Sequence, residues 1–358
     1  MKNKCTLLID GNWLLLSRFA VVGKGFGIDM PEHAKEYARL ELQSLMARSI
    51  SIVLNKFPLI DNIIFVSDGG SWRKQLPIPK SIEHVTYKGN RSQTKEYDWK
   101  YIYGALTDLT DQFKSLGVTV SNHSAIEGDD WIWYWSRRLN AEGTSCVIWS
   151  SDNDLKQLIQ TDQNTMAFTA WYNERNGTWV EQSLNHDNID DLDFFMQPDR
   201  FNLPVLEALK QSSTNVSYLS PDSIVMEKII CGDNGDNIKS IARINTGKRT
   251  YKVSIKIWNE IKDVLGINTL NEFFAKKNDI INYIKSIKKF VDCNIDDLSE
   301  MFDYNTKLVW LNEKVIPETI ILYMNQLEYK LFDVAYIKSN FKTLCKTDNS
   351  IEDIFNSI

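Results

Sequence analysis

The chain of 358 residues lacks the features that place a protein in a membrane or outside the cell. No apolar run approaches the roughly 20 residues that a transmembrane helix requires, and residues 1–10 contain no secretory signal segment. The five cysteines are scattered, odd in number and without metal-type spacing, which indicates reduced thiols. We therefore expect a cytoplasmic protein, in the host cytoplasm if it is viral, with Cys5 and Cys146 as core residues.

The chain also lacks a positive net charge. It has 41 Lys and Arg residues and 47 Asp and Glu residues, so its net charge is −6. The charge is segregated, however. Residues 71–100 hold seven basic and three acidic side chains, a local +4, and residues 239–290 hold twelve and four, a local +8. Each basic run is either a solvated helix face or a segment that steers a phosphate backbone toward an acidic centre. An acidic total thus does not exclude a nucleic-acid partner.

Internal repeats and low-complexity tracts are absent, and the hydrophobic share of 43% is that of a globular protein with a substantial core. The apolar pattern predicts helices over 34–57 and 131–140, and strands at 5–9, 63–67, 117–121 and 146–150. The pair Asn176-Gly177 predicts a hairpin within 165–182. Strands that alternate with helices predict an α/β fold, with a largely parallel sheet flanked by helices.

An aspartate follows three of the predicted strands. These residues are Asp10, Asp68 and Asp152, far apart in the sequence. In parallel sheets with helices on both faces, reactive groups collect beyond the carboxyl ends of the strands. We therefore expect the three carboxylates to lie close together in the folded chain.

Two short acidic clusters carry the strongest chemical signal. Glu127-Gly128-Asp129-Asp130 and Ser151-Asp152-Asn153-Asp154 place five carboxylates within 28 residues. Acidic residues also cap helices, but a cap uses only one or two carboxylates. The surplus suits Mg²⁺ or Mn²⁺, which prefer oxygen ligands. Two such ions about 3.5–4 Å apart are the usual clamp for phosphodiester hydrolysis, so the sequence predicts a metal-dependent nuclease.

Three further motifs are ambiguous on their own. Asp10-Gly11-Asn12 and Asp68-Gly69-Gly70 are also common turn sequences. A haloacid-dehalogenase-type phosphatase would begin in the same way, but it needs an aspartate where this chain has Asn12. Residues 232–237, with the sequence Gly-Asp-Asn-Gly-Asp-Asn, are either a simple turn or a source of two more carboxylates.

Lys88 and Arg91 are candidates for binding the scissile phosphate. They are three residues apart and would share a face if their segment is helical. Cations in that position stabilise the charge that builds in the transition state. Aromatic and basic residues alternate nearby as they do in single-strand platforms, although aromatic residues are as often packing residues; these are Trp72, Arg73, Lys74, Tyr97 and Trp99.

Taken in order, six segments resemble the 5′-nuclease (flap endonuclease) superfamily. Within it, the chain is most similar to the ribonuclease H branch of the T-even bacteriophages, which are 5′-to-3′ exonucleases and flap endonucleases. The spacing agrees from residue 5 to about 240, and six motifs in order are specific where each alone is weak. The segments are Leu8-Ile9-Asp10, Ser67-Asp68, Tyr87-Lys88-Gly89-Asn90-Arg91, Glu127-Gly128-Asp129-Asp130, Ser151-Asp152-Asn153-Asp154 and Gly232-Asp233-Asn234-Gly235-Asp236-Asn237.

The resemblance implies an acidic site for two Mg²⁺ ions, which Mn²⁺ can replace, a catalytic basic pair and a nucleic-acid surface. The implied metal ligands are Asp10, Asp68, Glu127, Asp129, Asp130, Asp152, Asp154, Asp233 and Asp236. The catalytic pair would be Lys88 and Arg91, on a helical arch or gateway. The implied nucleic-acid-binding residues are Arg73, Lys74, Lys95, Lys248, Arg249, Lys252 and Lys256. Residues 241–249 lack the Gly-x-x-Gly-x-Gly turn of the family, so no monovalent cation is expected there.

The same resemblance implies three regions. Residues 1–182 would form a PIN-like nuclease domain with the arch near 71–100, and residues 183–222 an acidic loop or insertion. Residues 223–358 would form a helical DNA-binding region that completes the metal site. The implied activity is Mg²⁺-dependent hydrolysis of 5′ flaps and RNA primers, in RNA/DNA or DNA duplexes, during DNA replication in a phage or cell.

Two alternatives remain open from the sequence. A PIN-type single-strand ribonuclease shares the acidic site but is usually smaller and lacks a long basic C-terminal region. A non-catalytic DNA-junction-binding protein would bind the same substrates without turnover. The expected partners are DNA and RNA/DNA hybrid with a free 5′ end, bound by a monomer, with a single-strand-binding protein and a sliding clamp as further candidates. Residues 350–355 are either a clamp peg or a frayed final helix.

Overall fold

The computed structural model describes residues 5–91, 94–162, 165, 167–182, 211, 213–247 and 249–329. They fall into two compact units. The first unit contains the residues up to Gly70, then 94–219 and the residues from 324 onward, and the second contains 71–93 and 220–323. The division differs from the predicted one, because 71–93 belongs with the C-terminal helices. Its residue Tyr87 is buried in the core of the second unit, and Leu76 and Ile82 pack against that core.

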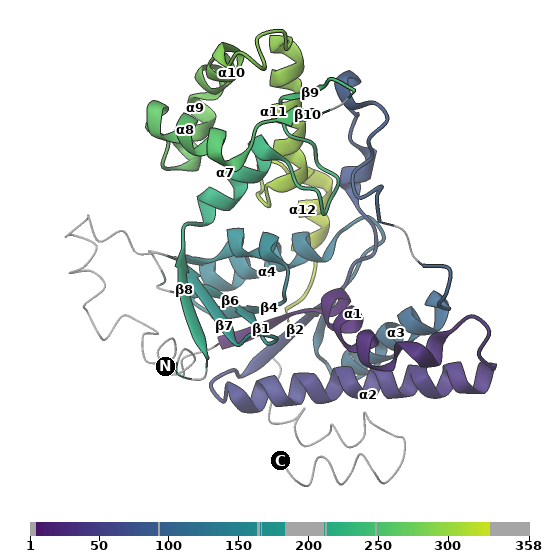
Figure 1. The fold of residues 1–358 in the computed structure, drawn as a ribbon. Helices are drawn as coiled ribbons and strands as arrows, with labels where there is room; N and C mark the ends of the chain where they lie inside the picture. Colours follow the sequence, from purple (N-terminus) through teal and green to yellow (C-terminus); the bar gives the residue numbers. More distant parts are fainter. Residues whose placement is uncertain are drawn as a thin grey trace. The chain divides into compact units, whose positions relative to one another are not determined.

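The first unit is built on one mixed sheet with the strand order β3-β2-β1-β4-β6-β7-β8, while β5 pairs with β6 (Figure 1). The neighbours from β3 to β6 are parallel, β7 runs antiparallel to β6, and β8 is parallel to β7. The predicted α/β fold with a largely parallel sheet is therefore confirmed. The strands are β1 Cys5–Asp10, β2 Asn62–Val66, β3 Thr119–Ser121, β4 Ser145–Trp149, β5 Gln160–Thr161, β6 Phe168–Asn173, β7 Thr178–Gln182 and β8 Asn215–Leu219.

Helices cover both faces of this sheet, as its fully apolar central strands require. Alternate residues of β1 point to opposite faces: Cys5, Leu7 and Ile9 belong to the core that α2 and α3 also line. Leu8 is equally buried on the other face, where α4 lies against β1 and β4. The helices are α1 Gly11–Val22, α2 Glu32–Lys56, α3 Trp99–Ser115 and α4 Gly128–Ala141.

Helix α4 is buried almost all round. Trp131, Trp133 and Trp135 follow an i, i+2 pattern, so one helix face cannot hold them all, yet each is at most 6% exposed. Tyr329, from the last described segment, packs its ring 5.7 Å from that of Trp135. The buried acidic start of this helix is therefore held rigidly.

Gly11 explains why α1 can start directly at the end of β1. A Cβ atom there would lie 2.6 Å from the Phe65 ring and 2.7 Å from the Val66 carbonyl oxygen. Only glycine permits so close an approach. The Asp10-Gly11 pair is thus a tight strand-to-helix junction rather than an ordinary reverse turn.

Two strand regions were missed by the sequence pattern. The predicted loop 183–222 contains β8 at its end, and the region from 223 onward, expected to be helical, contains the antiparallel pair β9 Arg243–Asn245 and β10 Thr250–Lys252. All three strands are short, and β8 exposes Val216 and Tyr218, so apolar periodicity does not mark a buried face. The hairpin expected around Asn176-Gly177 is present as β6 and β7.

The second unit is otherwise helical, with a core that includes Trp258, Phe273 and Phe302. Phe273 and Phe302 are stacked with ring centroids 5.0 Å apart. None of the helices in the described part of the chain combines the length and apolar character needed to span a bilayer. The helices are α7 Pro221–Cys231, α8 Ile255–Leu265, α9 Leu270–Ala275, α10 Lys277–Ser286, α11 Ile295–Val309 and α12 Glu318–Asn325, whose last residues return to the first unit.

Candidate active site

Three aspartates meet at the carboxyl ends of adjacent strands in the first unit. Asp10 is the last residue of β1, Asp68 follows β2, and Asp152 follows β4. Strand β1 lies between β2 and β4 in register, so its end is flanked by both. The convergence predicted from parallel strand ends is therefore present within this unit.

Asp10 is half-buried and caps α1. Its Oδ1 accepts a hydrogen bond from the Trp13 backbone N–H at 3.0 Å, and its Oδ2 accepts one from the Ser150 hydroxyl at 2.8 Å. Burial, together with the charges of Asp68 and Asp152, raises the pKa of Asp10 from 3.8 to about 7, although the two hydrogen bonds lower it. The three carboxylates therefore lie close enough to repel one another.

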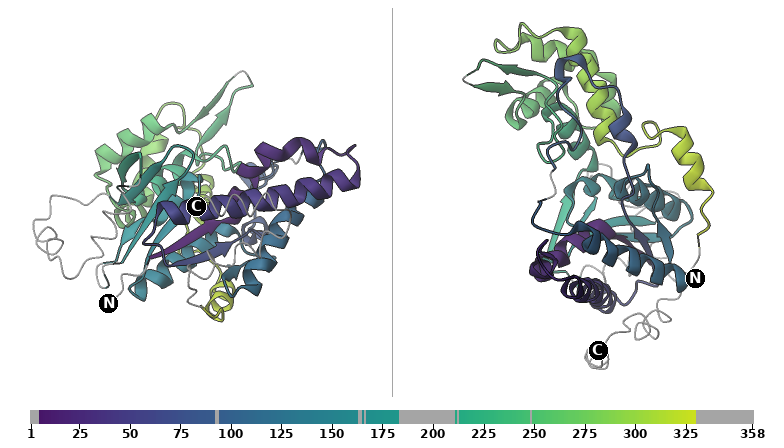
Figure 2. Two further views of the ribbon diagram at one scale, coloured as in Figure 1. Left: turned by 90° about the horizontal axis from the view of Figure 1, so that it is seen from below. Right: turned by 90° about the vertical axis from the view of Figure 1, so that its right-hand side faces the viewer.

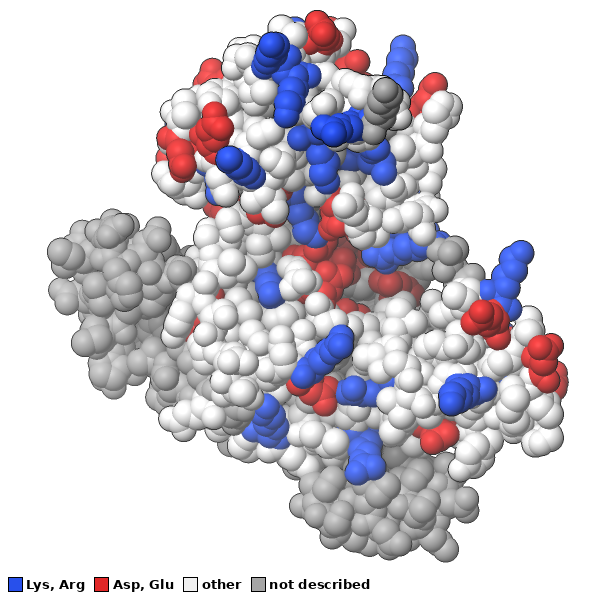
Figure 3. Space-filling model, in the orientation of Figure 1, with Lys and Arg blue, Asp and Glu red and all other residues white. Residues whose placement is uncertain are grey.

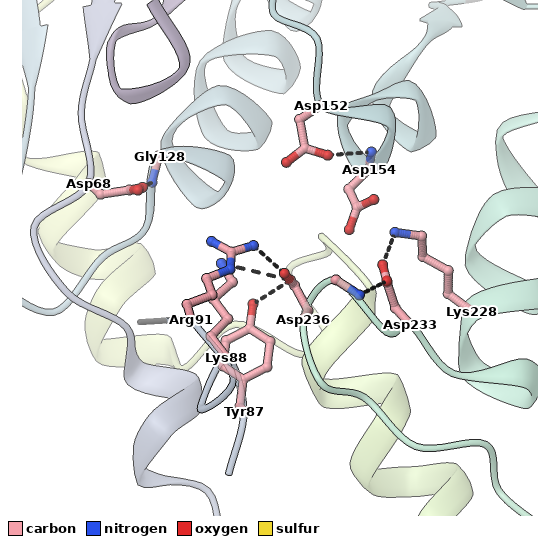
Figure 4. A network of polar contacts seen from close by, with 11 residues as sticks. Asp68, Tyr87, Lys88, Arg91, Gly128, Asp152, Asp154, Lys228, Asp233 and Asp236 are labelled. Atoms are coloured by element: carbon pink, nitrogen blue, oxygen red, sulfur yellow. Dashed lines mark hydrogen bonds and ion pairs between the residues drawn. The ribbon is translucent and has the colours of Figure 1, made fainter. Parts of the chain in front are cut away.

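Asp68 is tied to the start of α4. Its Oδ1 accepts a hydrogen bond from the Gly128 backbone N–H at 2.5 Å (Figure 4). The positive end of the helix dipole thus faces this carboxylate. Glu127 and Asp130 are buried and Asp129 is half-buried, so the first turn of α4 brings further carboxylates to the end of the sheet.

Asp152 begins the 3₁₀ helix η4, Asn153–Leu158. Its Oδ1 accepts a hydrogen bond from the Asp154 backbone N–H at 2.9 Å, and its carbonyl oxygen accepts one from the Trp171 indole N–H at 3.1 Å. The Lys156 ammonium lies 4.3 Å from the centre of the Trp171 ring. This loop is therefore fixed by the strand β6 beneath it.

Two uncharged residues that the sequence reasoning missed join the strand ends. The Ser150 hydroxyl donates to Asp10 and accepts a hydrogen bond from the Asp152 backbone N–H at 3.0 Å, so it bridges β1 and β4. The Asn12 side-chain oxygen accepts a hydrogen bond from the Asp68 backbone N–H at 2.9 Å, so it links α1 to the end of β2. The only available signal was their position beside a strand-end aspartate.

The side chains at this sheet edge have the chemistry that a divalent metal prefers, because they present carboxylate oxygens close together. The raised pKa of Asp10 reflects this crowding and its burial. Within the described residues, however, no three His, Cys, Asp or Glu side chains are arranged to hold one ion. Asp68 and Asp152 each direct one oxygen to a backbone N–H. Coordination by all three therefore requires side-chain rotation, which the exposed Asp68 permits.

The remaining two predicted metal ligands belong to the second unit, on the loop closed by backbone hydrogen bonds between Asp233 and Ile238. Asp233 accepts hydrogen bonds from the Lys228 ammonium at 2.5 Å and from the Gly235 backbone N–H at 2.7 Å. Burial opposes ionisation, but the hydrogen bond and charge of Lys228, together with backbone hydrogen bonds from Gly235 and Asp236, lower the pKa of Asp233. Their convergence with the carboxylates of the first unit stays a prediction.

Asp236 pairs with the predicted catalytic cations. Arg91 donates to its Oδ1, the Lys88 ammonium lies 3.8 Å from its Oδ2, and the Tyr87 hydroxyl donates to the same oxygen at 3.3 Å (Figure 4). The expectation of a helical segment is wrong for the described residues here. Lys88 has a φ of 55°, and its backbone N–H donates to the Asp236 carbonyl oxygen at 2.8 Å. A turn, and not a helix face, brings Lys88 and Arg91 together.

The described part of the expected arch contains two 3₁₀ helices, η2 Trp72–Gln75 and η3 Lys80–Ile82, and turns. Arg73 was expected to bind nucleic acid, but it is 2% exposed and its guanidinium lies 4.5 Å from the centre of the Trp72 ring. A side chain so buried is not presented to a phosphate backbone, so this assignment is corrected. The other described candidates are exposed: Lys74, Lys95, Arg249, Lys252 and Lys256.

Lys248 and the expected clamp peg at 350–355 lie outside the described residues. Among the cysteines, Cys5 and Cys146 are buried in the sheet, as expected, and are free thiols.

Comparison with known proteins identifies the family of this chain. Residues 5–186, about half of the chain, match the model of the family described as 5′-3′ exonuclease, N-terminal resolvase-like domain. A 5′-3′ exonuclease of Mycoplasmopsis pulmonis is 26% identical over 359 residues, which cover 97% of each chain.

Two solved structures of bacteriophage T5 proteins share the fold. One, co-crystallised with metal ions, has 16% identity and a TM-score of 0.53 and covers 98% of each chain. The other is a flap endonuclease complex with DNA and metal ions, with 16% identity and a TM-score of 0.51 over 98% of this chain and 99% of that one. The PIN-like α/β fold is thus shown, and the family match over the sheet and its acidic edge leads to one conclusion: this chain belongs to the 5′-3′ exonuclease family of the 5′-nuclease superfamily and is a phosphodiester-hydrolysing nuclease.

Proposed function

We propose that this nuclease is a Mg²⁺-dependent 5′-to-3′ exonuclease and flap endonuclease that removes 5′ flaps and RNA primers from duplexes during DNA replication. The observation that carries the proposal is the meeting of Asp10, Asp68 and Asp152 at three adjacent strand ends. Crowding and burial raise the pKa of Asp10, and a hard dication bound among these oxygens would offset the repulsion between the carboxylates. The two T5 structures, one solved with metal ions and the other with DNA and metal ions, support the same chemistry.

Asp10, Asp68, Asp129 and Asp152 would hold one ion, with Glu127, Asp130 and Asp154 supporting its surroundings, and Asp233 and Asp236 would serve a second. Bound divalent ions supply a lowered pKa for the attacking water and charge stabilisation for both reacting oxygens. Ser150 and Asn12 would keep the strand ends in place while Asp68 and Asp152 turn toward a ligand. The chain's own contribution is therefore a rigid sheet edge that brings several carboxylates close together.

Lys88 and Arg91 would neutralise the negative charge that develops on the reacting phosphate. Both cations form ion pairs with the Asp236 carboxylate, so they lie next to each other. A phosphate competes for such cations because it offers more negative charge and more acceptor oxygens than one carboxylate. Exchange of Asp236 for phosphate would thus accompany substrate binding.

Asp152→Asn tests the proposal because it removes one charge while keeping the shape of the side chain. We expect Mg²⁺-dependent cleavage of a 5′-flapped or RNA-primed duplex to fall at least about 10³-fold, an effect larger than that of one lost transition-state donor. Binding of the same substrate in EDTA should stay within a few-fold of the wild type.

The matched control is Asp111→Asn, on the exposed face of α3 beside Lys114. It should cleave as the wild type does. Full activity of Asp152→Asn, or equal loss in both variants, would refute the proposal. A wild-type chain that cleaves single-stranded RNA but no flapped duplex would instead establish the PIN-type ribonuclease, and tight binding without any turnover would establish a junction-binding protein.

A further inference from the structure

Two segments of the second unit that are far apart in the sequence are joined by hydrogen bonds. We call residues 86–91 the basic turn and residues 233–238 the acidic loop. The segment that carries the basic turn, residues 71–93, runs along the helices of the second unit in Figures 1 and 2. Tyr87 is 8% exposed and belongs to the core of that unit, so the turn starts from a buried side chain.

Asn237 of the acidic loop holds the start of the basic turn. Its Nδ2 donates a hydrogen bond to the Thr86 carbonyl oxygen at 2.9 Å, and its Oδ1 accepts one from the Lys239 ammonium at 2.6 Å. These two partners fix the orientation of the amide, because an ammonium can only donate and a carbonyl can only accept. The same Thr86 oxygen accepts a hydrogen bond from the Gly89 backbone N–H at 2.9 Å, which closes the turn. Asn237 therefore contacts the atom on which the turn is built.

Lys88 is the residue of the turn that most needs support from outside. Its φ of 55° lies in the left-handed region, which costs free energy in a residue that carries a side chain. Its backbone N–H donates to the Asp236 carbonyl oxygen at 2.8 Å. Beyond it, the Asn90 Nδ2 donates to the Asn234 carbonyl oxygen at 3.0 Å. The acidic loop thus holds the turn on both sides of Lys88.

The acidic loop can act as a support because it is closed on itself. Asp233 and Ile238 exchange backbone hydrogen bonds of 2.9 and 2.7 Å, and Ile238 is buried. Asn237 has a φ of 59°, a left-handed conformation that asparagine adopts more readily than most residues. The position of Asn237 is therefore set by its own loop and not by the turn that it contacts.

Charge alone does not distinguish Lys88 and Arg91 from other cations of the second unit. Figure 3 shows Lys and Arg side chains over the upper part of the molecule, where Figure 1 places α8, α10 and α11. A cation stabilises a transition state when it is held where the charge develops. The property that sets Lys88 and Arg91 apart is a fixed place beside the Asp236 carboxylate.

We infer that Asn237 and Asn90 are positioning residues for cleavage, which dock the basic turn on the acidic loop so that Lys88 and Arg91 meet the reacting phosphate in a fixed position. This inference rests on the proposed function, in which both cations leave Asp236 for that phosphate. The ion pairs with Asp236 are then lost, but the two amide contacts remain, because their acceptors are backbone carbonyl oxygens. The uncharged contacts would therefore keep the turn in place during the reaction.

Asn237→Asp tests the docking contact directly. It keeps the size of the side chain, a residue that tolerates the left-handed backbone and the acceptor for Lys239, but it replaces the donor to Thr86 with an oxygen. Two acceptors that face each other repel, so kcat for cleavage of a 5′-flapped duplex should fall about tenfold or more. Asn237→Gly, which fits the same backbone without adding charge, should also lower kcat, and Asn90→Ala should lower it about threefold.

Asn234→Asp is the matched control, because it changes an amide to a carboxylate on the same loop. Asn234 is exposed, and within the described residues it takes part in the docking through its backbone oxygen and not through its side chain. Its kcat should stay within about twofold of the wild type. Duplex binding in EDTA should be the same in Asn234→Asp and Asn237→Asp, so a lower kcat in the second variant does not come from added charge.

A double-mutant cycle separates positioning from a general loss of structure. In a chain that carries Lys88→Ala and Arg91→Ala, Asn237→Asp should change the single-turnover rate by less than about twofold, because the side chains through which it acts are gone. If the tenfold loss persists in that background, or if Asn234→Asp loses as much as Asn237→Asp, the inference is overturned.

Hydrogen exchange tests the docking without any cleavage. In metal-free protein, the amides of Lys88 and Gly89 should exchange about tenfold faster in Asn237→Asp than in the wild type, while those of α11 keep their rates. Equal exchange of the basic turn in the two proteins would overturn the inference. Faster exchange in the variant, together with a wild-type chain that cleaves no flapped duplex, would uphold the docking and refute the proposed function alone.

Discussion

Asp10 in the first unit and Asp233 in the second are both half-buried carboxylates, but their pKa values shift in opposite directions. Burial raises the pKa of Asp10 to about 7, and its charged neighbours are other aspartates. Asp233 lies beside the Lys228 ammonium, which overcomes burial and lowers its pKa. The same kind of side chain is therefore left short of positive charge in one unit and supplied with it in the other.

The difference follows from how each unit positions its carboxylates. In the first unit they stand at the ends of parallel strands, where Asp10 and Asp68 accept hydrogen bonds from the backbone N–H groups at the starts of α1 and α4. In the second unit they stand on a loop that Lys228, Lys88 and Arg91 surround. The crowded aspartates give the first arrangement an electrostatic reason to take up a cation, so the first of the two proposed ions is placed there.

The largest expected effect comes from removing one of the crowded carboxylate charges, that of Asp10. In metal-free protein, Asp10→Asn should raise the free energy of unfolding at pH 8 by on the order of 2–4 kcal/mol. Because the folded pKa of about 7 exceeds the unfolded value near 3.8, the folded wild type binds more protons between those values. Its stability therefore falls as pH rises from about 4 to 7, and the advantage of the variant should vanish near pH 4.

Urea unfolding in EDTA at pH 4, 6 and 8 measures this dependence. Parallel stability curves for the wild type and the variant would show that Asp10 is not crowded. Added Mg²⁺ supplies a second comparison, since it should stabilise the wild type and leave Asp10→Asn nearly unchanged.

The second prediction removes the positive charge that lies beside Asp233 in the second unit. Lys228→Met should leave Asp233 half-buried without its cation and cost about 2 kcal/mol of stability at pH 7, less than a fully buried pair would. The folded pKa of Asp233 is lowered, so the stabilisation is present above the unfolded value near 4 and is lost as pH falls through the folded value. The difference between wild type and variant should therefore disappear once the pH lies below the folded pKa of Asp233. Lys262→Met is the control, because this lysine covers the Trp258 ring and not a carboxylate; equal losses in the two variants at pH 7 would contradict the prediction.

The same contrast explains what could be predicted from the sequence. Asp10, Asp68 and Asp152 were placed together correctly, because strand periodicity and parallel pairing determine where each strand ends. Lys88 and Arg91 lie close together, but not because they share a helix face. Their proximity depends on a left-handed turn at Lys88 and on a carboxylate almost 150 residues away, and no local pattern encodes either.

Arg73 and the strands β9 and β10 show a related limit of the sequence pattern. The resemblance and the alternation of aromatic and basic residues marked Arg73 as nucleic-acid-binding, but its guanidinium is buried against the Trp72 ring. Arg243 lies in a basic region that is helical as expected except at β9 and β10, so its pairing with Lys252 could not be foreseen. Side chains that act through tertiary partners are where the sequence pattern is least informative.

The smallest effect concerns the hydroxyl that joins two strand ends. Ser150 is fully buried, donates to Asp10 and accepts from the Asp152 backbone N–H. Ser150→Ala should cost about 1 kcal/mol of stability, since each hydrogen bond contributes that order and the exposed edge of the sheet admits some water. Its effect on ion binding should be clearer, because residues that orient metal ligands typically change affinity about tenfold.

Thermal shift against Mg²⁺ concentration measures this without requiring cleavage. We expect Ser150→Ala to need about ten times more Mg²⁺ for half of the full stabilisation, while Ser151→Ala, its half-buried neighbour, keeps the wild-type value. If Ser150→Ala loses stability but retains the wild-type Mg²⁺ midpoint, the hydroxyl is a packing feature only. In that case the rigidity of the acidic edge would come from the strands and α4 alone, and the contrast between the two units would rest on charge rather than on positioning.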